Sequence, residues 1–357
     1  MAFLHPGQPV RKGLCGVAFL YGLIVRLRLA CYHFRWFRSS QMPCRVVSVG
    51  NLTVGGTGKT PVVILLTQWL QSQGRRVAVL SRGYKRASGV PQLLVSDGGT
   101  ILASPSEAGD EPFLIARRCP KAIVAVGADR AALGQWVLAQ HPVDCMILDD
   151  GFQHLGIRRD VDLVLLDATD ATGLDAMAPA GRLREPLDGL ARATAVVVTR
   201  ADSKEEVEAI SGRLRTAGLQ FNDSIEVLFK ADSCVSVQAE ENKPLDWCRG
   251  KSLWLVSGIG NSESFRRSAL SAGVEVVGET VFQDHHRYDA DDVHRIRAAA
   301  QSAKADIVMT TEKDAGKLLL FLLPQDSWWA LRVRAEVVRG EERLRRLVLG
   351  DGVQARA

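Results

Sequence analysis

Residues 53–60 read T-V-G-G-T-G-K-T and stand between an apolar run, 46–49, and a helix-like stretch, 61–73. A strand that ends in a glycine-rich turn and continues into a helix directs several backbone N–H groups and the helix dipole at one point, which suits a polyphosphate. Lys59 is then expected to reach the β- and γ-phosphates of a nucleotide, and the Thr60 hydroxyl to ligate Mg²⁺. The predicted nucleotide-binding residues are Thr53, Val54, Gly55, Gly56, Thr57, Gly58, Lys59 and Thr60.

The first position of this loop departs from the common pattern G-x-x-x-x-G-K-[ST], because the chain has Thr53 where the pattern has glycine. A glycine-rich surface turn is the alternative interpretation. The strand before the loop and the helix after it favour a phosphate-binding loop.

Two adjacent carboxylates, Asp149 and Asp150, follow the apolar run 145–148. An apolar strand that ends in carboxylates is the form of a Walker B element, whose aspartate holds Mg²⁺ beside the loop hydroxyl. The alternative is an aspartate pair that caps a turn before Gly151. The glycine loop stands roughly 90 residues upstream on what we expect to be a nearby strand, and this favours the metal-binding interpretation.

Asp110 and Glu111 stand just ahead of a helix-like stretch, 113–118. Acidic side chains are common at a helix start because they complement the helix dipole, and Pro112 suits the first turn. In the functional interpretation, Asp110 accepts a proton from a substrate hydroxyl and Glu111 serves the metal. The local pattern leaves both interpretations open.

Asp284, His285 and His286 follow a strand-like run in the second half of the chain. An Asp-His pair on a loop is suited to relaying a proton, although a histidine pair is more often structural.

Residues 81–86 and 181–186 place arginines in loops, where parallel sheets bind ligands. Residues 199–202, T-R-A-D, share only part of the guanine-reading pattern N-K-x-D.

These side chains need a scaffold that brings the ends of several strands together. Short runs that are apolar throughout alternate with helical stretches after Pro43, which predicts a doubly wound, mostly parallel α/β sheet of the P-loop NTPase type. A second, smaller α/β series follows. The predicted strands are 46–49, 76–80, 122–126, 145–148, 163–166, 195–198, 252–256, 274–281 and 306–310, and the predicted helices include 201–220, 262–272 and 290–302.

The chain of 357 residues is long enough for two lobes. We predict a basic amphipathic, membrane-associating segment at 1–42, a P-loop nucleotide-binding lobe at 43–225, and a second α/β lobe at 226–357 that closes over the site. The boundary between the lobes is expected within 222–246.

The amino-terminal segment carries a charge-free run at 14–25, followed by arginines interleaved with aromatic and aliphatic residues. This run is shorter than the about 20 residues that a membrane-spanning helix needs. No small-residue cleavage site marks a signal peptide. The mixture predicts an amphipathic helix that lies in a membrane surface, and a helix packed on its own domain is the alternative.

The net charge of +5 suits an anionic lipid surface, a phosphorylated substrate or nucleic acid, and it does not choose among them. The seven cysteines include no C-x-x-C pair. They therefore indicate neither a zinc site nor a disulfide framework, and they fit a reducing cytosol.

An ordered set of motifs over most of the chain resembles the tetraacyldisaccharide 4'-kinase family, the lipid A 4'-kinases. In this family the glycine loop has threonine at the position of Thr53. The departure from the common pattern is therefore part of the resemblance. The matching segments are 50–61, 81–84, 109–112, 149–154, 179–186, 257–261, 282–285 and 311–315.

The resemblance implies that ATP, with Mg²⁺, donates its γ-phosphate to the 4'-hydroxyl of tetraacyldisaccharide 1-phosphate, giving lipid IVA in lipid A (lipopolysaccharide) biosynthesis. It implies a location at the cytoplasmic face of the bacterial inner membrane, peripheral or monotopic through the N-terminal helix. The expected partners are the lipid acceptor and the membrane surface, with no nucleic acid and no obligatory protein partner.

The resemblance also implies a role for each matching residue. Lys59 contacts the phosphates, Asp110 is the base, and His285 is the partner of that base. His285 is favoured over His286 because it directly follows Asp284. The implied metal ligands are Thr60, Asp149, Asp150 and Glu111, and the implied further site residues are Tyr84, Gln153, Arg184 and Glu185.

A P-loop GTPase or metal-insertion chaperone, which uses hydrolysis as a switch, is the main alternative. It predicts guanine preference and no phosphorylated lipid, and residues 199–202 are its only support. A membrane-binding scaffold without catalysis is a third possibility, but it leaves the paired carboxylates and Lys59 unexplained.

Overall fold

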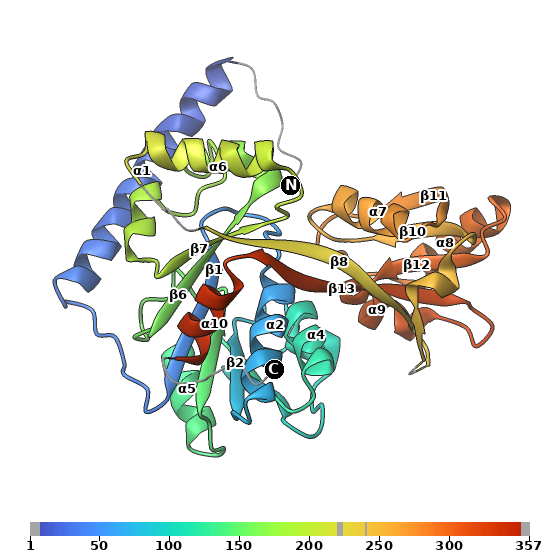
Figure 1. Cartoon of the computed structure of the whole chain (residues 1–357), viewed down its shortest axis with the longest axis horizontal. Helices are drawn as coiled ribbons and strands as arrows, with labels where there is room; N and C mark the ends of the chain where they lie inside the picture. Colours follow the sequence, from blue (N-terminus) through green and yellow to red (C-terminus); the bar gives the residue numbers. More distant parts are fainter. Residues whose placement is uncertain (1–7, 220–223, 240, 351–357) are drawn as a thin grey trace.

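One mixed sheet of 13 strands runs through two lobes in the computed structural model, which describes residues 8–219, 224–239 and 241–350, with side chains from residue 14 (Figure 1). The strand order is β11-β10-β12-β13-β8-β7-β6-β1-β5-β2-β4-β3, and β9 pairs with β8 outside this path. Most neighbouring strands are parallel. The predicted doubly wound, mostly parallel α/β fold is confirmed.

The first lobe has a parallel core whose strands are buried on both faces, as their apolar runs predict. Helices α2 (Lys59–Ser72) and α4 (Asp110–Arg118) cover one face, and α5 (Arg130–Leu138) covers the other. The predicted strands are present as β1 (Arg45–Asn51), β2 (Val77–Ser81), β4 (Ile123–Gly127), β5 (Cys145–Asp149), β6 (Val161–Asp167) and β7 (Ala195–Thr199).

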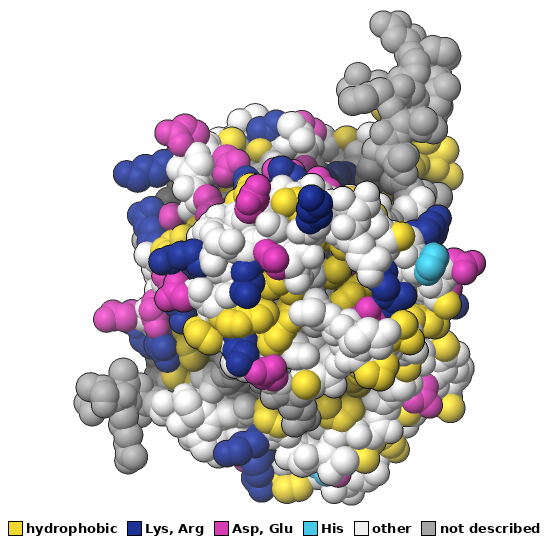
Figure 2. All heavy atoms as spheres, turned by 90° about the vertical axis from the view of Figure 1, so that its right-hand side faces the viewer, with side chains coloured by type: hydrophobic (Ala, Val, Ile, Leu, Met, Phe, Trp, Pro, Cys, Tyr) yellow, Lys and Arg dark blue, Asp and Glu magenta, His cyan; other side chains and the backbone are white. Residues whose placement is uncertain are grey.

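The second lobe repeats the α/β arrangement on a smaller scale, and its predicted strands and helices are also present. Strands β10 (Ser252–Ser257), β11 (Glu275–Val281) and β12 (Ile307–Thr311) lie between α7 (Ser262–Ser271) on one face and α8 (Ala290–Ser302) with α9 (Glu312–Leu318) on the other. The outward face of this lobe carries both charge signs interspersed with apolar side chains (Figure 2).

Two long antiparallel strands, β8 (Ile225–Ser236) and β13 (Trp328–Arg339), connect the lobes (Figure 1). The boundary expected within 222–246 therefore falls on a continuous strand. Helix α10 (Glu341–Leu349) then returns to the first lobe, where Arg45 donates hydrogen bonds to the carbonyls of Leu347 and Val348. The end of the segment predicted as second lobe thus packs in the core of the first lobe.

The remaining elements are short or peripheral. They are β3 (Gln92–Asp97), α3 (Pro105–Ala108), η1 (Ala168–Leu174), η2 (Leu187–Arg192), α6 (Lys204–Thr216), β9 (Asn242–Pro244), η3 (Leu245–Cys248) and η4 (Leu319–Phe321).

The amino-terminal helix α1 (Gln8–His33) lies along the outside of the first lobe (Figure 1). Its stretch Leu14–His33 is long and apolar enough to cross a membrane by length and composition alone. The prediction that the apolar stretch is too short to span a membrane is therefore wrong, because apolar residues between the arginines extend it beyond the charge-free run 14–25.

Candidate active site

The glycine loop joins β1 to α2, which begins at Lys59. Gly58 has a φ of 81°, in the left-handed region that favours glycine. A Cβ atom at Gly58 would lie 2.1 Å from Cζ of Phe229, a ring that strand β8 brings against the loop. Both the turn and the close approach of Phe229 therefore require glycine here.

The start of the loop explains why threonine replaces glycine at position 53. Thr53 is buried and forms an isolated antiparallel β-bridge with Leu183, so its backbone is extended and any residue type fits. The next residue, Val54, donates its N–H to the carbonyl of Arg182 at 2.7 Å. The backbone N–H groups further along the loop are thus better placed for phosphates than that of Val54.

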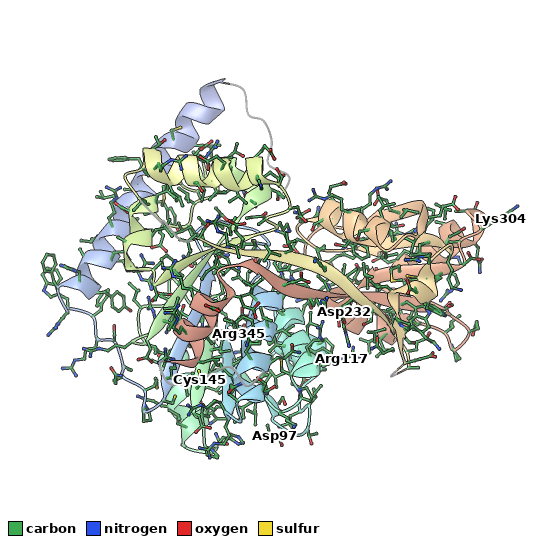
Figure 3. All side chains as sticks on the ribbon, viewed as in Figure 1. Asp97, Arg117, Cys145, Asp232, Lys304 and Arg345 are labelled. Carbon is green, nitrogen blue, oxygen red and sulfur yellow. The ribbon has the colours of Figure 1, made fainter. Side chains whose placement is uncertain are left out.

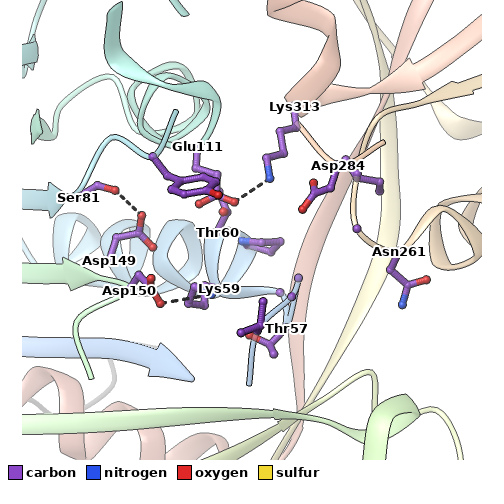
Figure 4. A pocket seen from close by; sticks show the side chains of 18 of the residues that line it. Thr57, Lys59, Thr60, Ser81, Glu111, Asp149, Asp150, Asn261, Asp284 and Lys313 are labelled. Carbon is purple, nitrogen blue, oxygen red and sulfur yellow. Dashed lines mark hydrogen bonds and ion pairs between the residues drawn. The ribbon is translucent and has the colours of Figure 1, made fainter. Parts of the chain in front are cut away.

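A cavity of about 820 Å³ lies between the two lobes and contains the glycine loop (Figure 4). All the predicted site residues line it except Thr53 and Asp110. Carboxylates and Lys59 come from the first lobe, whereas Asn261, Asp284 and Lys313 face them from the second lobe. The site is therefore shared between the lobes.

Lys59 lies among the groups that the sequence assigned to phosphate and metal. Its Nζ is 3.2 Å from Oδ1 of Asn51 and 3.5 Å from Oδ1 of Asp150. Arg184 also binds Asp150, with its Nη1 2.9 Å from Oδ2. Burial alone would raise the pKa of Asp150, but Lys59 and Arg184 outweigh it and lower the pKa to about 2. Asp150 is thus held as an anion by two cations.

The environment of Asp149 raises its pKa, in contrast to that of Asp150. Asp149 is buried at the end of β5, and Ser81 donates a hydrogen bond of 2.8 Å to its Oδ2. Burial, followed by repulsion from Glu111 and Asp150, raises the pKa of Asp149 to about 7. Its other oxygen, Oδ1, has no hydrogen-bond partner among the described residues.

These groups fit a magnesium ion. A buried carboxylate oxygen without a partner, surrounded by further carboxylates, is suited to a divalent cation. The described part of the chain contains no preformed group of three or more His, Cys, Asp or Glu side chains that could hold a metal. Mg²⁺ is commonly held by one or two carboxylates together with substrate phosphates and water, so a small protein ligand set suits it.

Glu111 reaches the cavity from the first turn of α4 and pairs with Lys313 of the second lobe, at 2.7 Å (Figure 4). Burial raises the pKa of Glu111, but Lys313 and Lys59 outweigh burial and lower it. The Glu111–Lys313 pair is one of the contacts that join the lobes at the site.

Asp110 and His285 also meet across the lobes, with Nδ1 of His285 3.2 Å from Oδ2 of Asp110. Burial raises the pKa of Asp110, but the contacts of this carboxylate with His285 and Lys317 outweigh burial and lower it. His285 lines the cavity and Asp110 lies behind it. The imidazole is therefore the member of the pair that lines the cavity.

His286 has a different set of partners. Its Nε2 is 2.7 Å from Oδ2 of Asp292 in α8, and its ring stacks on Phe282 at 4.4 Å. These contacts hold His286 within the second lobe and give it a structural role. The preference for His285 as the partner of Asp110 agrees with this geometry.

We expect the His285→Ala variant to lose about 100-fold in kcat, because general acid–base groups contribute on this scale. His286→Ala is expected to keep most of its turnover and to lose about 1–3 kcal/mol of unfolding free energy, because Asp292 is left buried without that partner. Steady-state kinetics and thermal unfolding of both variants measure this. The reverse ranking in kcat would assign the role to His286.

The further predicted residues, Tyr84, Gln153, Arg184 and Glu185, all line the cavity. Gln153 donates to Oε1 of Glu185 at 2.7 Å, and Glu185 pairs with Arg192 at 2.7 Å. Tyr84 is exposed and packs edge-on against His285, with ring centroids 5.3 Å apart. Gln153 and Glu185 are thus joined by a hydrogen bond, whereas Arg184 binds Asp150 and Tyr84 lines the cavity beside His285.

Arg130 and Phe229 are among the cavity residues that the sequence did not indicate. Arg130 is buried, and its Nε has no hydrogen-bond partner among the described residues. It follows closely after β4, and the rule that ligands bind beyond the carboxyl ends of strands would have indicated it. Phe229 lies on β8, a strand that the sequence did not predict, so no signal pointed to it.

The fold and the site together define an α/β protein of the phosphate-binding-loop class with a two-lobed nucleotide site. The family model for tetraacyldisaccharide-1-P 4'-kinase matches residues 10–351. The chain belongs to this family, as its resemblance predicted.

Individual relatives agree with this assignment. The tetraacyldisaccharide 4'-kinase of Syntrophus aciditrophicus is 40% identical over 308 residues, covering 84% of this chain and 82% of the relative. That of Geobacter metallireducens is 40% identical over 302 residues, covering 84% and 86%. The solved structure of LpxK from Aquifex aeolicus in complex with ATP matches with a TM-score of 0.76 and 31% identity, covering 95% of this chain and 98% of that one.

Proposed function

We propose that this protein transfers the γ-phosphate of ATP to the 4'-hydroxyl of tetraacyldisaccharide 1-phosphate, giving lipid IVA. The observation that carries the proposal is the convergence of Lys59 from the glycine loop and the Asp110–His285 pair at one interlobe cavity. Phosphoryl transfer depends mainly on positioning and charge neutralisation, and this arrangement supplies both.

In this proposal each phosphate-binding group has one task. Lys59 and the N–H groups of the glycine loop hold the β- and γ-phosphates, and Arg184 keeps Asp150 in place beside Lys59. The residues that would hold Mg²⁺ are Thr60, Asp149, Asp150 and Glu111. When bound, this ion would neutralise charge that develops on the transferred phosphoryl group.

The Asp110–His285 pair accepts the proton of the acceptor hydroxyl. The sequence assigned the base to Asp110 itself. Because His285 lies at the cavity wall, its ring is the member of the pair nearer to the hydroxyl, and Asp110 orients that ring through Nδ1. Nε2 lies 3.8 Å from Oδ2 of Asp284, which is too long for a hydrogen bond, and it is then available as a proton acceptor.

Helix α1 is proposed to hold the enzyme at the cytoplasmic face of the membrane. Leu20, Leu23, Ile24 and Leu27 form an exposed apolar stripe at helical spacing. On another face, Tyr21 donates to the carbonyl of Arg184 at 2.9 Å, and Arg28 donates to that of Gln153 at 3.0 Å. One side of α1 thus meets the cavity wall while the apolar stripe remains available to lipid.

A chain that begins at Gln41 is expected to lose its binding to anionic lipid vesicles, because it lacks the apolar stripe and the arginines of α1. Cosedimentation of the truncated and full chains with vesicles measures this. A full-length Leu20→Ser/Leu23→Ser/Leu27→Ser variant is the matched control for the stripe alone. Equal binding of the truncated and full chains would contradict the membrane role of α1.

The choice of nucleotide separates the kinase from the GTPase alternative. We expect labelled phosphate to pass from ATP to the lipid acceptor, with turnover that depends on the acceptor. The alternative requires GTP hydrolysis without a phosphorylated lipid. Parallel incubations with γ-labelled ATP and GTP, each with and without acceptor, distinguish the two outcomes.

A further inference from the structure

Lys317 on α9 lies close to the reacting groups although it does not line the cavity. Its Nζ is 3.1 Å from Oδ2 of Asp110 and 3.0 Å from Oδ1 of Asp314. It also donates to the carbonyl of His286 at 3.1 Å. The contact with the carbonyl of His286 is a hydrogen bond, and the contacts with Asp110 and Asp314 are ion pairs.

The second lobe fixes the position of Lys317 through Asp314. This carboxylate is fully buried, and its Oδ2 accepts hydrogen bonds from the N–H of Gly258 at 2.9 Å and from the hydroxyl of Thr311 at 2.7 Å. The Lys317 side chain is 13% exposed, and the ring of Tyr288 packs beside its ammonium. Lys317 therefore extends from a rigid part of the second lobe.

Lys317 and His285 contact the same oxygen of Asp110, Oδ2. A hydrogen bond with His285 and an ion pair with Lys317 at one oxygen restrict the rotation of the carboxylate and, through it, the orientation of the imidazole. The other oxygen, Oδ1, has no hydrogen-bond or ion-pair partner in the part of the chain that the structure describes. Asp110 belongs to α4 of the first lobe, so both contacts cross between the lobes.

We propose that Lys317 is a positioning residue for phosphoryl transfer. It holds Asp110, Asp110 holds the ring of His285, and the imidazole meets the acceptor at the cavity wall. The series Asp314, Lys317, Asp110 and His285 thus couples the position of the second lobe to the proton-accepting group. The proposal rests on the role of the Asp110–His285 pair in the proposed function.

The central test compares Lys317→Met with Lys317→Arg. We expect the methionine variant to lose about 10- to 100-fold in kcat, because a displaced catalytic group costs on this scale. Its KM values for ATP and acceptor should stay within about twofold of wild type, since Lys317 does not line the cavity. The arginine variant keeps the charge and should recover most of the lost kcat.

A folding control is needed because Lys317→Met leaves Asp314 buried without its cation. The double variant Lys317→Met/Asp314→Asn removes both charges together, and it should unfold near the wild-type temperature with the same loss of kcat. Lys304→Met makes the same substitution at an exposed site at the outer end of the second lobe and should match wild type (Figure 3).

The combined effect on kcat of substitutions at Lys317 and Asp110 distinguishes a role that acts through Asp110 from a general structural role. If Lys317 acts through Asp110, adding Lys317→Met/Asp314→Asn to Asp110→Asn should lower the residual kcat no further. The inference is overturned if the double variant folds normally and keeps wild-type kcat, if Lys317→Arg is as slow as Lys317→Met, or if the losses multiply. Normal turnover of Asp110→Asn alone would instead contradict the proposed function of the pair.

Discussion

Replacing Lys59 with alanine is expected to lower kcat/KM by about 1000-fold or more, because the site would lose the cation that we propose contacts the transferred phosphoryl group. Lys59 lies between Asn51 and Asp150, and its backbone starts α2, so the ammonium is rigidly positioned over the loop. Catalysis of phosphoryl transfer depends mainly on positioning the reactants and on such charge neutralisation.

The fold should survive this substitution, since Asp150 keeps its contact with Arg184 at 2.9 Å. Thermal unfolding tests this point, and titration with ATP measures how much of the loss arises from nucleotide binding. Lys121→Ala, which removes an exposed lysine of the same lobe, is the matched control. Activity of Lys59→Ala within about tenfold of wild type would contradict the assigned role of the glycine loop.

Replacing Asp110 with asparagine or alanine is expected to reduce kcat by about 100- to 10,000-fold, the range of general acid–base contributions. Asp110 lies behind His285 and does not line the cavity. The affinity for ATP should therefore change far less than the turnover. The asparagine variant keeps the shape of the side chain, but its neutral amide no longer holds the Nδ1–H of His285 as an anion does.

Kinetics with saturating lipid acceptor and a separate ATP-binding titration test this expectation. Asp291→Asn is a suitable control, since Asp291 is an exposed first-turn aspartate of α8 remote from the cavity lining. If Asp110→Asn keeps nearly wild-type turnover, the proton passes to another group. If ATP affinity falls as much as turnover, Asp110 acts on nucleotide binding and not on the acceptor.

The glycine loop and the Asp149–Asp150 pair were predictable from the sequence because their signals are local. The tight turn at Gly58 and the apolar strand before each motif depend on a few adjacent residues. Buried parallel strands are apolar along their whole length, so they stand out as short runs. The predicted strands of both lobes were confirmed for this reason.

Strands β8 and β13 were missed because neither is apolar along its whole length. Both strands connect the lobes, and polar residues interrupt them, as Glu226, Lys230 and Asp232 do in β8. Only the first four residues of β13, 328–331, form a buried apolar run. Phe229, which requires Gly58 in the loop, was missed along with β8. The expected lobe boundary fell on β8 for the same reason.

The arrangement behind the cavity depends on contacts between residues far apart in the chain. The sequence identified Asp110 and His285 through a family resemblance, but it did not indicate that His285 faces the cavity while Asp110 lies behind it. In the sequence, Lys317 is an ordinary helical lysine. Only the packing of α9 against α4 brings it to Asp110. Such placements arise from tertiary packing, for which no local pattern exists.

The most direct test of the proposed reaction is the site of phosphorylation on its lipid product. Purified protein is incubated with ATP, Mg²⁺ and tetraacyldisaccharide 1-phosphate, and the product is examined by proton–phosphorus correlation spectroscopy. We predict a second phosphorus coupled to the proton at the 4' carbon, with none formed by Lys59→Ala. A phosphate at another position, or ATP hydrolysis without a bisphosphorylated lipid, would contradict the account.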